Sequence, residues 1–233
     1  MNDAGPRVLI VDDEPGFRRF LHASLAAHGY SVREAPTGED ALQIVPAFRP
    51  DIILLDLGLP GLQGTQVTAS LRDWTQTPII ILSVQGEESA KIAALDAGAD
   101  DYLTKPFGTG ELRARMRAAL RRAHRPDAEP VFVIGDLTVD LTERIVRLGE
   151  SDVPLTPTEY SLLKAFVVHA NRLLTHSQLV REVWGGAHYE DSHHLLRVNI
   201  SNLRRKLEAD PARPRYIVTE PGVGYRLRAG AAS

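Results

Sequence analysis

One stretch limits the possible folds more than any other. It is the apolar run 52–55 together with the single carboxylate, Asp56, that ends it. Pro50 precedes the run, and a turn rich in glycine and proline follows over 58–61. An apolar run between such residues is typical of a strand buried on both faces. Asp56 then stands at the carboxyl end of a strand, where open α/β sheets bind ligands. The alternative is a surface aspartate that caps the next helix.

Length and composition restrict the class of protein. A chain of 233 residues has room for two ordinary domains, and 43% hydrophobic with 24% charged residues is typical of a globular protein. No apolar run approaches the roughly 20 residues that a membrane-spanning helix needs. The sequence has no cysteine, which excludes disulfides and thiolate chemistry. The start MNDAGPR lacks the features of a signal peptide, so we expect a cytoplasmic protein without membrane insertion.

Net charge does not by itself indicate a nucleic-acid partner. Residues 1–122 hold 13 Lys/Arg and 16 Asp/Glu, and residues 123–233 hold 14 of each. Binding to a polyanion would therefore have to depend on local clusters of basic residues.

The first half of the chain alternates between strand and helix patterns. This alternation predicts a doubly wound, five-stranded parallel sheet of the flavodoxin-like type with helices on both faces. The expected strands are Arg7–Asp12, Ser31–Glu34, Ile52–Asp56, Pro78–Leu82 and Asp101–Leu103. The expected helices are Pro15–His28, about Thr37–Ala47, Gln66–Trp74, Glu87–Ala97 and Thr109–Arg122.

Polar side chains follow the ends of these strands: Asp12 and Asp13, Asp56, Ser83 and Lys105. Carboxylates that share one edge repel each other, and a hard divalent cation such as Mg²⁺ relieves the repulsion. A carboxylate beside a lysine, a hydroxyl and a metal ion is suited to accept a phosphoryl group. Taken singly, each residue has a simpler explanation as a solvated strand end, a helix cap or a surface cation. It is the set that indicates chemistry.

Four motifs carry a family resemblance. VLIVDDEP, LDLGLPGLQG, IILS and ALDAGADDYLTKPF occur in this order, and residues 6–122 resemble a bacterial response-regulator receiver domain. The resemblance implies that Asp56 accepts phosphate from a sensor histidine kinase. It further implies that Asp12, Asp13 and Asp56, with the Gly58 carbonyl, bind Mg²⁺.

The same resemblance assigns a switch. It implies that Ser83 and Lys105 contact the phosphoryl group, that Tyr102 turns inward on activation, and that the bond between Lys105 and Pro106 is cis. Val84 departs from the family pattern, which usually has a small residue there. A β-branched side chain at this point would narrow access to the acceptor.

Charged residues in the last part of this domain resemble the dimer-forming face of the OmpR/PhoB subfamily. We expect Lys91 to pair with Glu111, and Asp101 with Arg115, across a two-fold interface. Arg122 would pair with Asp96 or Asp100. Considered one at a time, each of these charges is a solvated surface residue.

The residues after 122 indicate a linker and a second domain. We expect a receiver over 1–122, a linker over 123–130 and a smaller α+β domain over 131–233. Short alternating segments at 131–134, 137–140, 145–148 and 152–155 predict an antiparallel sheet. Capping boxes starting at Thr156 and Thr175 predict two helices, the second ending near Trp184. A long helix over about 191–208 precedes a hairpin of 216–219 and 224–227.

The long helix has basic and amide side chains suited to a DNA major groove. The candidates for DNA contact are Arg197, Asn199, Ser201, Asn202, Arg204, Arg205 and Lys206. The alternative is a solvated amphipathic helix.

LTPTEYSLL, LRVNISNLRRKLE and DPARPRYIVTEPGVGYRL extend the resemblance to the winged helix-turn-helix effector of the OmpR/PhoB subfamily, over 131–228. It implies that Arg197, Asn199 and Asn202 face bases, that Arg204 and Arg205 serve the DNA backbone, and that the loop 185–190 contacts RNA polymerase.

These inferences predict a transcriptional regulator, not an enzyme, that dimerises and binds double-stranded DNA when Asp56 is phosphorylated. Two alternatives come from other classes. One is a Mg²⁺-dependent phosphohydrolase that uses Asp56 as a turnover nucleophile, against which stands the lack of a general base at Gly58. The other is a module that only binds partners.

Overall fold

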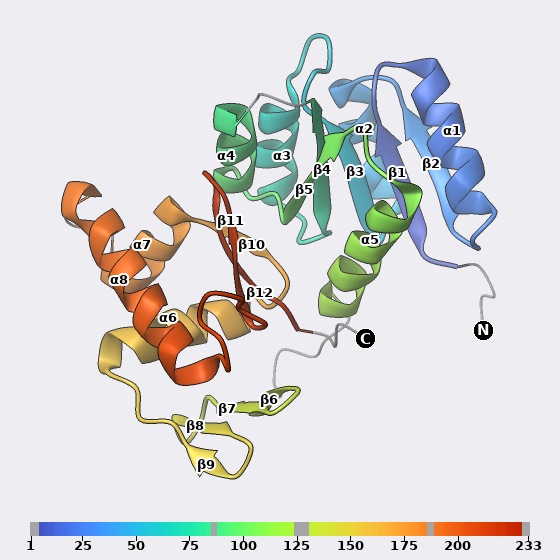
Figure 1. Cartoon of the computed structure of the whole chain (residues 1–233). Coiled ribbons are helices and arrows are strands. Elements are labelled where there is room, and N and C mark those ends of the chain that lie inside the picture. The colour runs from blue at the N-terminus through green and yellow to red at the C-terminus, as the bar shows by residue number, and fades with distance from the viewer. Residues whose placement is uncertain (1–4, 85–87, 124–130, 186–188, 230–233) are drawn as a thin grey trace. The chain divides into compact units, whose positions relative to one another are not determined.

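The computed structural model describes residues 5–84, 88–123, 131–185 and 189–229 (Figure 1). The chain divides into two compact units, 1–124 and 125–233, which we treat separately. Within the described ranges no helix is long and apolar enough to cross a membrane.

The first unit is built on one parallel sheet of five strands in the order β2-β1-β3-β4-β5. The expected doubly wound α/β fold is therefore confirmed. The central strand β3 is buried along its whole length, and Asp56 ends it opposite Leu82 of β4. The strands are β1 (Arg7–Val11), β2 (Ser31–Ala35), β3 (Ile52–Asp56), β4 (Ile79–Val84) and β5 (Asp101–Lys105).

Five helices cover the two faces of this sheet (Figure 1). Leu21 of α1 and Met116 of α5 share one apolar cluster with alternate residues of the central strands, so these two helices cover one face. Because the central strands β1, β3 and β4 are buried on both faces, the remaining helices cover the other face. The helices are α1 (Pro15–Ala26), α2 (Gly38–Phe48), α3 (Gly64–Arg72), α4 (Glu88–Asp96) and α5 (Thr109–Ala123).

Two strands extend further than the sequence predicts. We expected β4 to end at Leu82 and β5 at Leu103, where the apolar residues stop. In the structure the parallel ladder continues, pairing Ser83 with Thr104 and then Val84 with Lys105. Main-chain pairing is indifferent to side-chain polarity, so the polar residues remain in the sheet at its carboxyl edge.

The second unit begins with an antiparallel sheet of four strands, as predicted. Its strands are β6 (Val131–Ile134), β7 (Leu137–Asp140), β8 (Ile145–Leu148) and β9 (Ser151–Asp152). The last strand is shorter than the expected 152–155, because Pro154 has no N–H to donate to the ladder. The expectation for β9 was therefore wrong at its C-terminal end.

Three helices and a second sheet complete this unit. The helices are α6 (Pro157–Val168), α7 (His176–Trp184) and α8 (Tyr189–Leu207). Both predicted capping boxes are present, at Thr156 with Glu159 and at Thr175 with Gln178. The hairpin strands are β11 (Ile217–Glu220) and β12 (Gly224–Leu227). A third strand, β10 (Leu173–Thr175), pairs with β12 and was not predicted from the sequence. Three residues between two helices are too few to show an alternating pattern.

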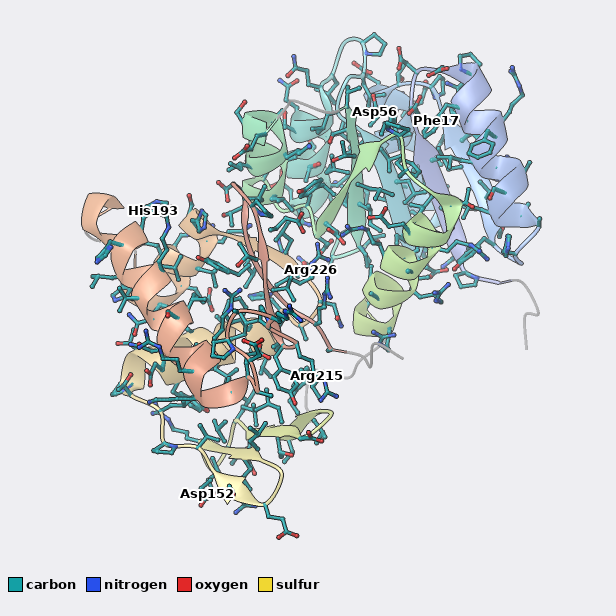
Figure 2. The ribbon with its side chains drawn as sticks, in the orientation of Figure 1. Phe17, Asp56, Asp152, His193, Arg215 and Arg226 are labelled. Atoms are coloured by element: carbon teal, nitrogen blue, oxygen red, sulfur yellow. The ribbon has the colours of Figure 1, made fainter. Side chains whose placement is uncertain are left out.

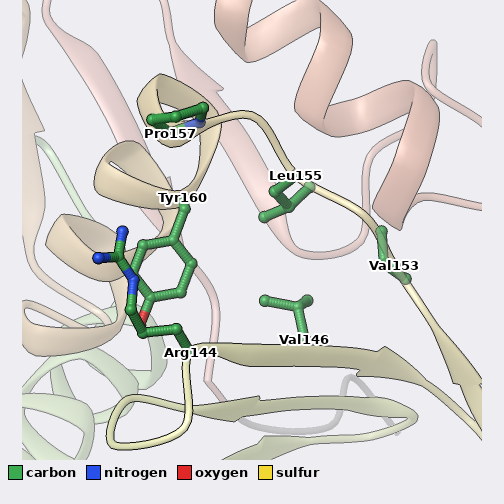
Figure 3. Close-up of a pocket in the computed structure, with 6 residues that line it drawn as sticks. All are labelled: Arg144, Val146, Val153, Leu155, Pro157 and Tyr160. Atoms are coloured by element: carbon green, nitrogen blue, oxygen red, sulfur yellow. The ribbon is translucent and has the colours of Figure 1, made fainter.

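A hollow of about 160 Å³ lies between β8 and the start of α6 (Figure 3). Its wall contains Val146 and Leu155, and the Arg144 guanidinium stacks on the Tyr160 ring at 4.6 Å from the centroid. Arg144 has a positive φ of 57°, which places the side chain over the ring despite a less favourable backbone conformation. The stacking joins the turn between β7 and β8 to α6.

Two buried carboxylates fix the long helix α8 in this unit. Glu208 accepts backbone N–H bonds from Arg215, Tyr216 and Ile217, at 2.7–2.9 Å for the shortest bond to each. Glu159 accepts from the Lys206 ammonium at 2.7 Å. Burial opposes ionisation of Glu159, yet the Lys206 and Thr156 hydrogen bonds hold the pKa of this carboxyl below its usual value.

We predict that Lys206→Met lowers the free energy of unfolding of the second unit by about 1–3 kcal/mol at neutral pH, because it leaves Glu159 without its cation. The lowered pKa of Glu159 makes this contribution complete above the usual glutamate pKa. It is lost as the pH falls through the folded-state value. Urea denaturation of the full chain, followed by Trp184 fluorescence in a Trp74→Phe background, measures the difference.

Asp152→Asn is the matched control, since it breaks the exposed ion pair to Arg147. It should change stability by less than about 1 kcal/mol. Equal losses in the two variants would contradict a structural role for Lys206.

Candidate functional site

Three charged side chains meet at the carboxyl edge of the parallel sheet. Asp12 directly follows β1, Asp56 ends β3, and Lys105 ends β5. The Lys105 ammonium donates to Asp12 Oδ2 at 2.7 Å and to Asp56 Oδ1 at 2.8 Å. Figure 2 labels Asp56 at this edge. The sequence analysis placed these residues at strand ends, and the structure brings them into direct contact.

Burial sets the electrostatics of this cluster. Asp12 is fully buried, Asp56 is 7% exposed, and the Lys105 side chain is 22% exposed. Burial, assisted by the nearby Asp12 carboxylate, raises the pKa of Asp56 despite the hydrogen bond from Lys105. Burial also disfavours the Lys105 cation, but hydrogen bonds to Asp12 and Asp56 hold the pKa of this lysine above its usual value. The edge is thus a partly enclosed acidic site with one internal cation.

The backbone after β3 lies close to the Asp56 carboxylate. The Gly58 N–H donates to Asp56 Oδ2 at 3.0 Å. Gly64 opens α3 where a Cβ would lie 2.5 Å from the Asp56 carbonyl oxygen, so a glycine is required there. Asp13 is exposed beside Asp12. No cluster of three or more acidic or histidine side chains arranged to hold a metal occurs in the described ranges, where Lys105 bridges two of the predicted ligands.

The end of β4 brings Ser83 and Val84 to the same edge. The Ser83 hydroxyl is buried and has no hydrogen-bond partner among the described residues. Such groups are rare, because an unpaired buried hydroxyl is costly. Val84 is 55% exposed, so the β-branched side chain stands on the surface next to the site.

Tyr102 occupies the edge strand β5 and is half-buried. The Lys91 ammonium lies 5.0 Å from the centroid of its ring and donates to Thr104 Oγ1 at 3.0 Å. Lys91 is itself buried, so its contacts in the single chain are to β5 and not to Glu111.

The acidic and basic residues of β5 and α5 pair within the chain. Arg115 Nη1 contacts both carboxylate oxygens of Asp101 at 3.1 Å, and Arg115 Nη2 contacts Glu111 at 2.9 Å. Asp96, at the end of α4, is exposed. The pair that the sequence analysis placed across an interface is thus already formed inside one chain.

Asp100, a predicted member of the dimer face, makes its contacts within the chain. Its side chain is buried, pairs with Arg72 at 2.7 Å and accepts the Ile79 N–H at 2.9 Å. Arg72 also donates to the Gly98 carbonyl at 2.8 Å, so this network fixes the entry to β5. A contact of Asp100 across a dimer interface stays a prediction. The Arg122 side chain lies outside the described residues.

Helix α8 exposes only part of the predicted DNA-contact set. Arg197, Ser201 and Arg205 are exposed at i, i+4 and i+8, which places them on one stripe of the helix. Asn202 is half-buried, and its Oδ1 accepts from Arg205 at 3.4 Å. Asn199 Nδ2 donates to the Leu195 carbonyl of its own helix at 2.8 Å.

Two basic residues of this helix make hydrogen bonds or ion pairs within the domain. Arg204 donates to the Ile217 carbonyl at 2.7 and 3.0 Å and to Thr219 Oγ1 at 2.7 Å, which ties α8 to the hairpin. Lys206 pairs with Glu159. Both were expected to contact DNA. Within the chain, internal acceptors already take up several of their donor groups, and DNA contact by these two residues stays a prediction. A run of basic residues gave no signal that separates inward from outward positions. The loop 185–190 includes 186–188, which lie outside the described residues.

Two residues that contact Asp12 or Lys105 were not singled out by sequence reasoning. Arg18 donates to the Asp12 carbonyl through Nη1 at 2.6 Å, and the Phe17 ring lies under the Lys105 ammonium at 4.3 Å. Both belong to the first turns of α1, where they fit an ordinary helix pattern. The signal available in the sequence was that both residues follow Asp12, at the end of the first strand, within a few positions.

Two family models match the chain. Residues 8–117 match the response regulator receiver domain, and residues 149–227 match the C-terminal domain of transcriptional regulatory proteins. The chain is 50% identical to the KDP operon transcriptional regulatory protein KdpE of Escherichia coli K12, over 94% of this chain and 98% of that protein. It is 45% identical to KdpE of Mycobacterium tuberculosis, over 95% and 99% of the two chains.

Two solved structures that cover at least 95% of this chain are also similar. A mutant of RitR has a TM-score of 0.51 at 28% identity, covering 97% of this chain and 100% of that one. DrrB, a Thermotoga maritima OmpR/PhoB homologue, has a TM-score of 0.49 at 30% identity, covering 95% and 98%. The relatives are named as transcriptional regulators and not as enzymes, so the phosphohydrolase alternative is set aside. The chain belongs to the OmpR/PhoB-type response regulators, with a receiver domain followed by a DNA-binding domain.

Proposed function

We propose that this regulator is switched by phosphorylation of Asp56, with a sensor histidine kinase as the donor. The observation that carries the proposal is the Lys105 ammonium held 2.8 Å from Asp56 Oδ1 at the edge of a receiver-type sheet. A cation at this distance compensates the charge that a phosphoryl group adds. The partly exposed edge also leaves room for the donor.

The reaction is transfer of a phosphoryl group to a carboxylate. An oxygen of Asp56 forms a bond to phosphorus while the bond from phosphorus to the imidazole nitrogen of the donor breaks. The electron pair of that bond stays on the imidazole, and the product is an acyl phosphate on Asp56. Lys105 stays beside the transferred oxygens. The unpartnered Ser83 hydroxyl at the end of β4 then gains an acceptor.

A divalent cation fits the donor set at this edge. Asp12, Asp13 and Asp56 carry three negative charges, and Lys105 supplies one positive charge, so the cluster remains acidic. All the donors are oxygens, including the Gly58 carbonyl, which suits Mg²⁺. When bound, Mg²⁺ would supply charge neutralisation for the phosphoryl oxygens.

Activation then couples Asp56 to the dimer face through β4 and β5. As Ser83 moves toward the phosphoryl group, the half-buried Tyr102 ring turns inward, and Lys91 loses its position over that ring. The Asp101–Arg115 pair lies on the same strand–helix surface. A homodimer forms when such intrachain pairs exchange partners with a second copy, joined by the exposed Glu111 and Asp96.

The effector domain reads double-stranded DNA with α8. The exposed stripe of Arg197, Ser201 and Arg205, with Asn202 beside it, supplies phosphate and base-edge donors. The loop 185–190 contacts RNA polymerase. Residues 1–122 act as the receiver, 123–130 as the linker and 131–233 as the effector.

The target is a potassium-transport operon. Support comes from two KdpE relatives at 45–50% identity, one of them named as a KDP operon regulator. Because the regulator binds chromosomal DNA, it works in the cytoplasm.

We predict that Asp56→Asn abolishes dimerisation in acetyl phosphate and Mg²⁺, because the amide accepts no phosphoryl group. Weak DNA binding should remain. Sedimentation velocity of the full chain measures the change. Asp73→Asn, which removes an exposed carboxylate at the end of α3, should dimerise as the wild type does. A dimer of the Asp56 variant under these conditions would refute the switch.

We predict that Val84→Ala speeds both phosphorylation and hydrolysis of the acyl phosphate by about 3-fold, a barrier change of less than about 1 kcal/mol. The smaller side chain opens the surface beside Asp56 to donor and water. Acid-quenched intact mass spectrometry gives both rates. Val168→Ala, a similarly exposed valine in the other unit, should leave them unchanged. Unaltered rates in the Val84 variant would show that this side chain does not limit access to Asp56.

We predict that Arg205→Ala weakens binding to all duplexes and lowers the slope of log affinity against log salt by about 1, as loss of one phosphate contact requires. Arg197→Ala should instead relax base preference at one position, by about 1–3 kcal/mol. Duplexes recovered from a random library, tested by fluorescence anisotropy across salt, separate the two effects. Arg213→Ala, an exposed arginine outside α8, should change neither quantity.

A further inference from the structure

Lys105 has a third neighbour besides the two carboxylates. Its ammonium lies 4.3 Å from the centroid of the Phe17 ring. This distance is well inside the range in which a cation is attracted to the negative face of an aromatic ring. Figure 2 labels Phe17 and Asp56 at the same edge of the first unit. One ammonium is therefore held between two carboxylates and an aromatic face.

The Phe17 ring is fixed by its place in the chain. It is the third residue of α1, which starts right after the acidic pair at 12–13. Its ring meets Phe107, two residues after Lys105, edge-on at a centroid distance of 5.9 Å. Phe17 thus contacts the segment that carries Lys105 both through the ammonium and through the aromatic pair, and it is itself half-buried.

The aromatic contact differs from the two ion pairs in one respect. Asp12 and Asp56 are shared groups: under the proposed function one ligates a cation and the other accepts a phosphoryl group. The Phe17 ring takes part in neither role, so it remains available to Lys105 throughout. A lysine side chain is flexible, and fixing it has a large entropic cost. A permanent neighbour lowers the number of positions that the ammonium can adopt.

We propose that Phe17 is a positioning residue that holds the Lys105 ammonium beside Asp56 for phosphoryl transfer. The proposal rests on the proposed function of Asp56. It assigns to α1 a direct part in the rate of the reaction, through the electrostatics of a ring that touches neither donor nor acceptor.

The test is a series of fluorinated phenylalanines at position 17 of the full chain. Ring fluorines withdraw electron density from the face of the ring and leave its size nearly unchanged. With acetyl phosphate and Mg²⁺, the rate constant for phosphorylation of Asp56 should fall stepwise with each added fluorine, by about 3–10-fold for the trifluoro ring, as loss of a cation–π contact predicts. Acid-quenched intact mass spectrometry gives the rates.

Two further variants control for packing. Phe17→Leu should slow the reaction at least as much as the trifluoro ring. Phe20→Leu should not, because Phe20 is 54% exposed on the same helix and its ring contacts Phe17 rather than Lys105. Proton NMR adds an independent readout: the Lys105 ε-methylene protons should be shifted upfield by the ring in the wild type and in Phe20→Leu, and not in Phe17→Leu.

Equal rates across the fluorinated series, with the wild type phosphorylated, would overturn the positioning role. A wild-type chain that acquires no phosphate on Asp56 would overturn the proposed function instead. The fluorinated rings are nearly isosteric, so the series decides the matter even if Phe17→Leu does not fold.

Discussion

The structure of the first unit depends on how two buried carboxylates share one ammonium. Asp12 and Asp56 end adjacent strands, and without Lys105 their repulsion would oppose the parallel pairing of β1 and β3. The lysine comes from β5, two strands away from β3 in the sheet. Correct strand order is therefore required before the charges are balanced. A site of this kind forms only when the whole sheet is assembled, which links the proposed phosphoryl-acceptor chemistry to the fold itself.

Buried carboxylates are also compensated by structural groups in the second unit. Glu159 and Glu208 are buried, and each is satisfied by groups that also define the geometry of α8. These groups are the Lys206 ammonium and three backbone N–H groups at the start of β11. Arg204 adds a link to the hairpin. The inner charges of α8 thus hold the helix in place, and Arg197, Ser201 and Arg205 are left to face solvent.

Much of this was predictable, and the reasons for the exceptions are physical. The α/β alternation and the residues at the carboxyl edge follow from the strand patterns that precede Asp56, Ser83 and Lys105. Capping boxes at Thr156 and Thr175 gave two helix starts. The intrachain partners of Asp100, Arg204 and Lys206 were not predicted, because a charged side chain in a helix or loop carries no mark of its partner. Arg72 and Glu159 are far from them in sequence, so only the folded chain shows the pairing.

The intrachain ion pairs near β5 limit how the proposed phosphorylation can change the affinity of the dimer face. Asp101 and Arg115 already satisfy each other in one chain, and Lys91 is buried over Tyr102. An interface built from such residues gains little from new ion pairs, because each one replaces an old one. Under the proposed function, the free energy for assembly then comes from phosphorylation of Asp56, through the strand β4 that lies between β3 and β5. Under the proposed function, dimerisation that depends on exchange of ion pairs is weak until Asp56 carries the additional charge of a phosphoryl group, which is what a switch requires.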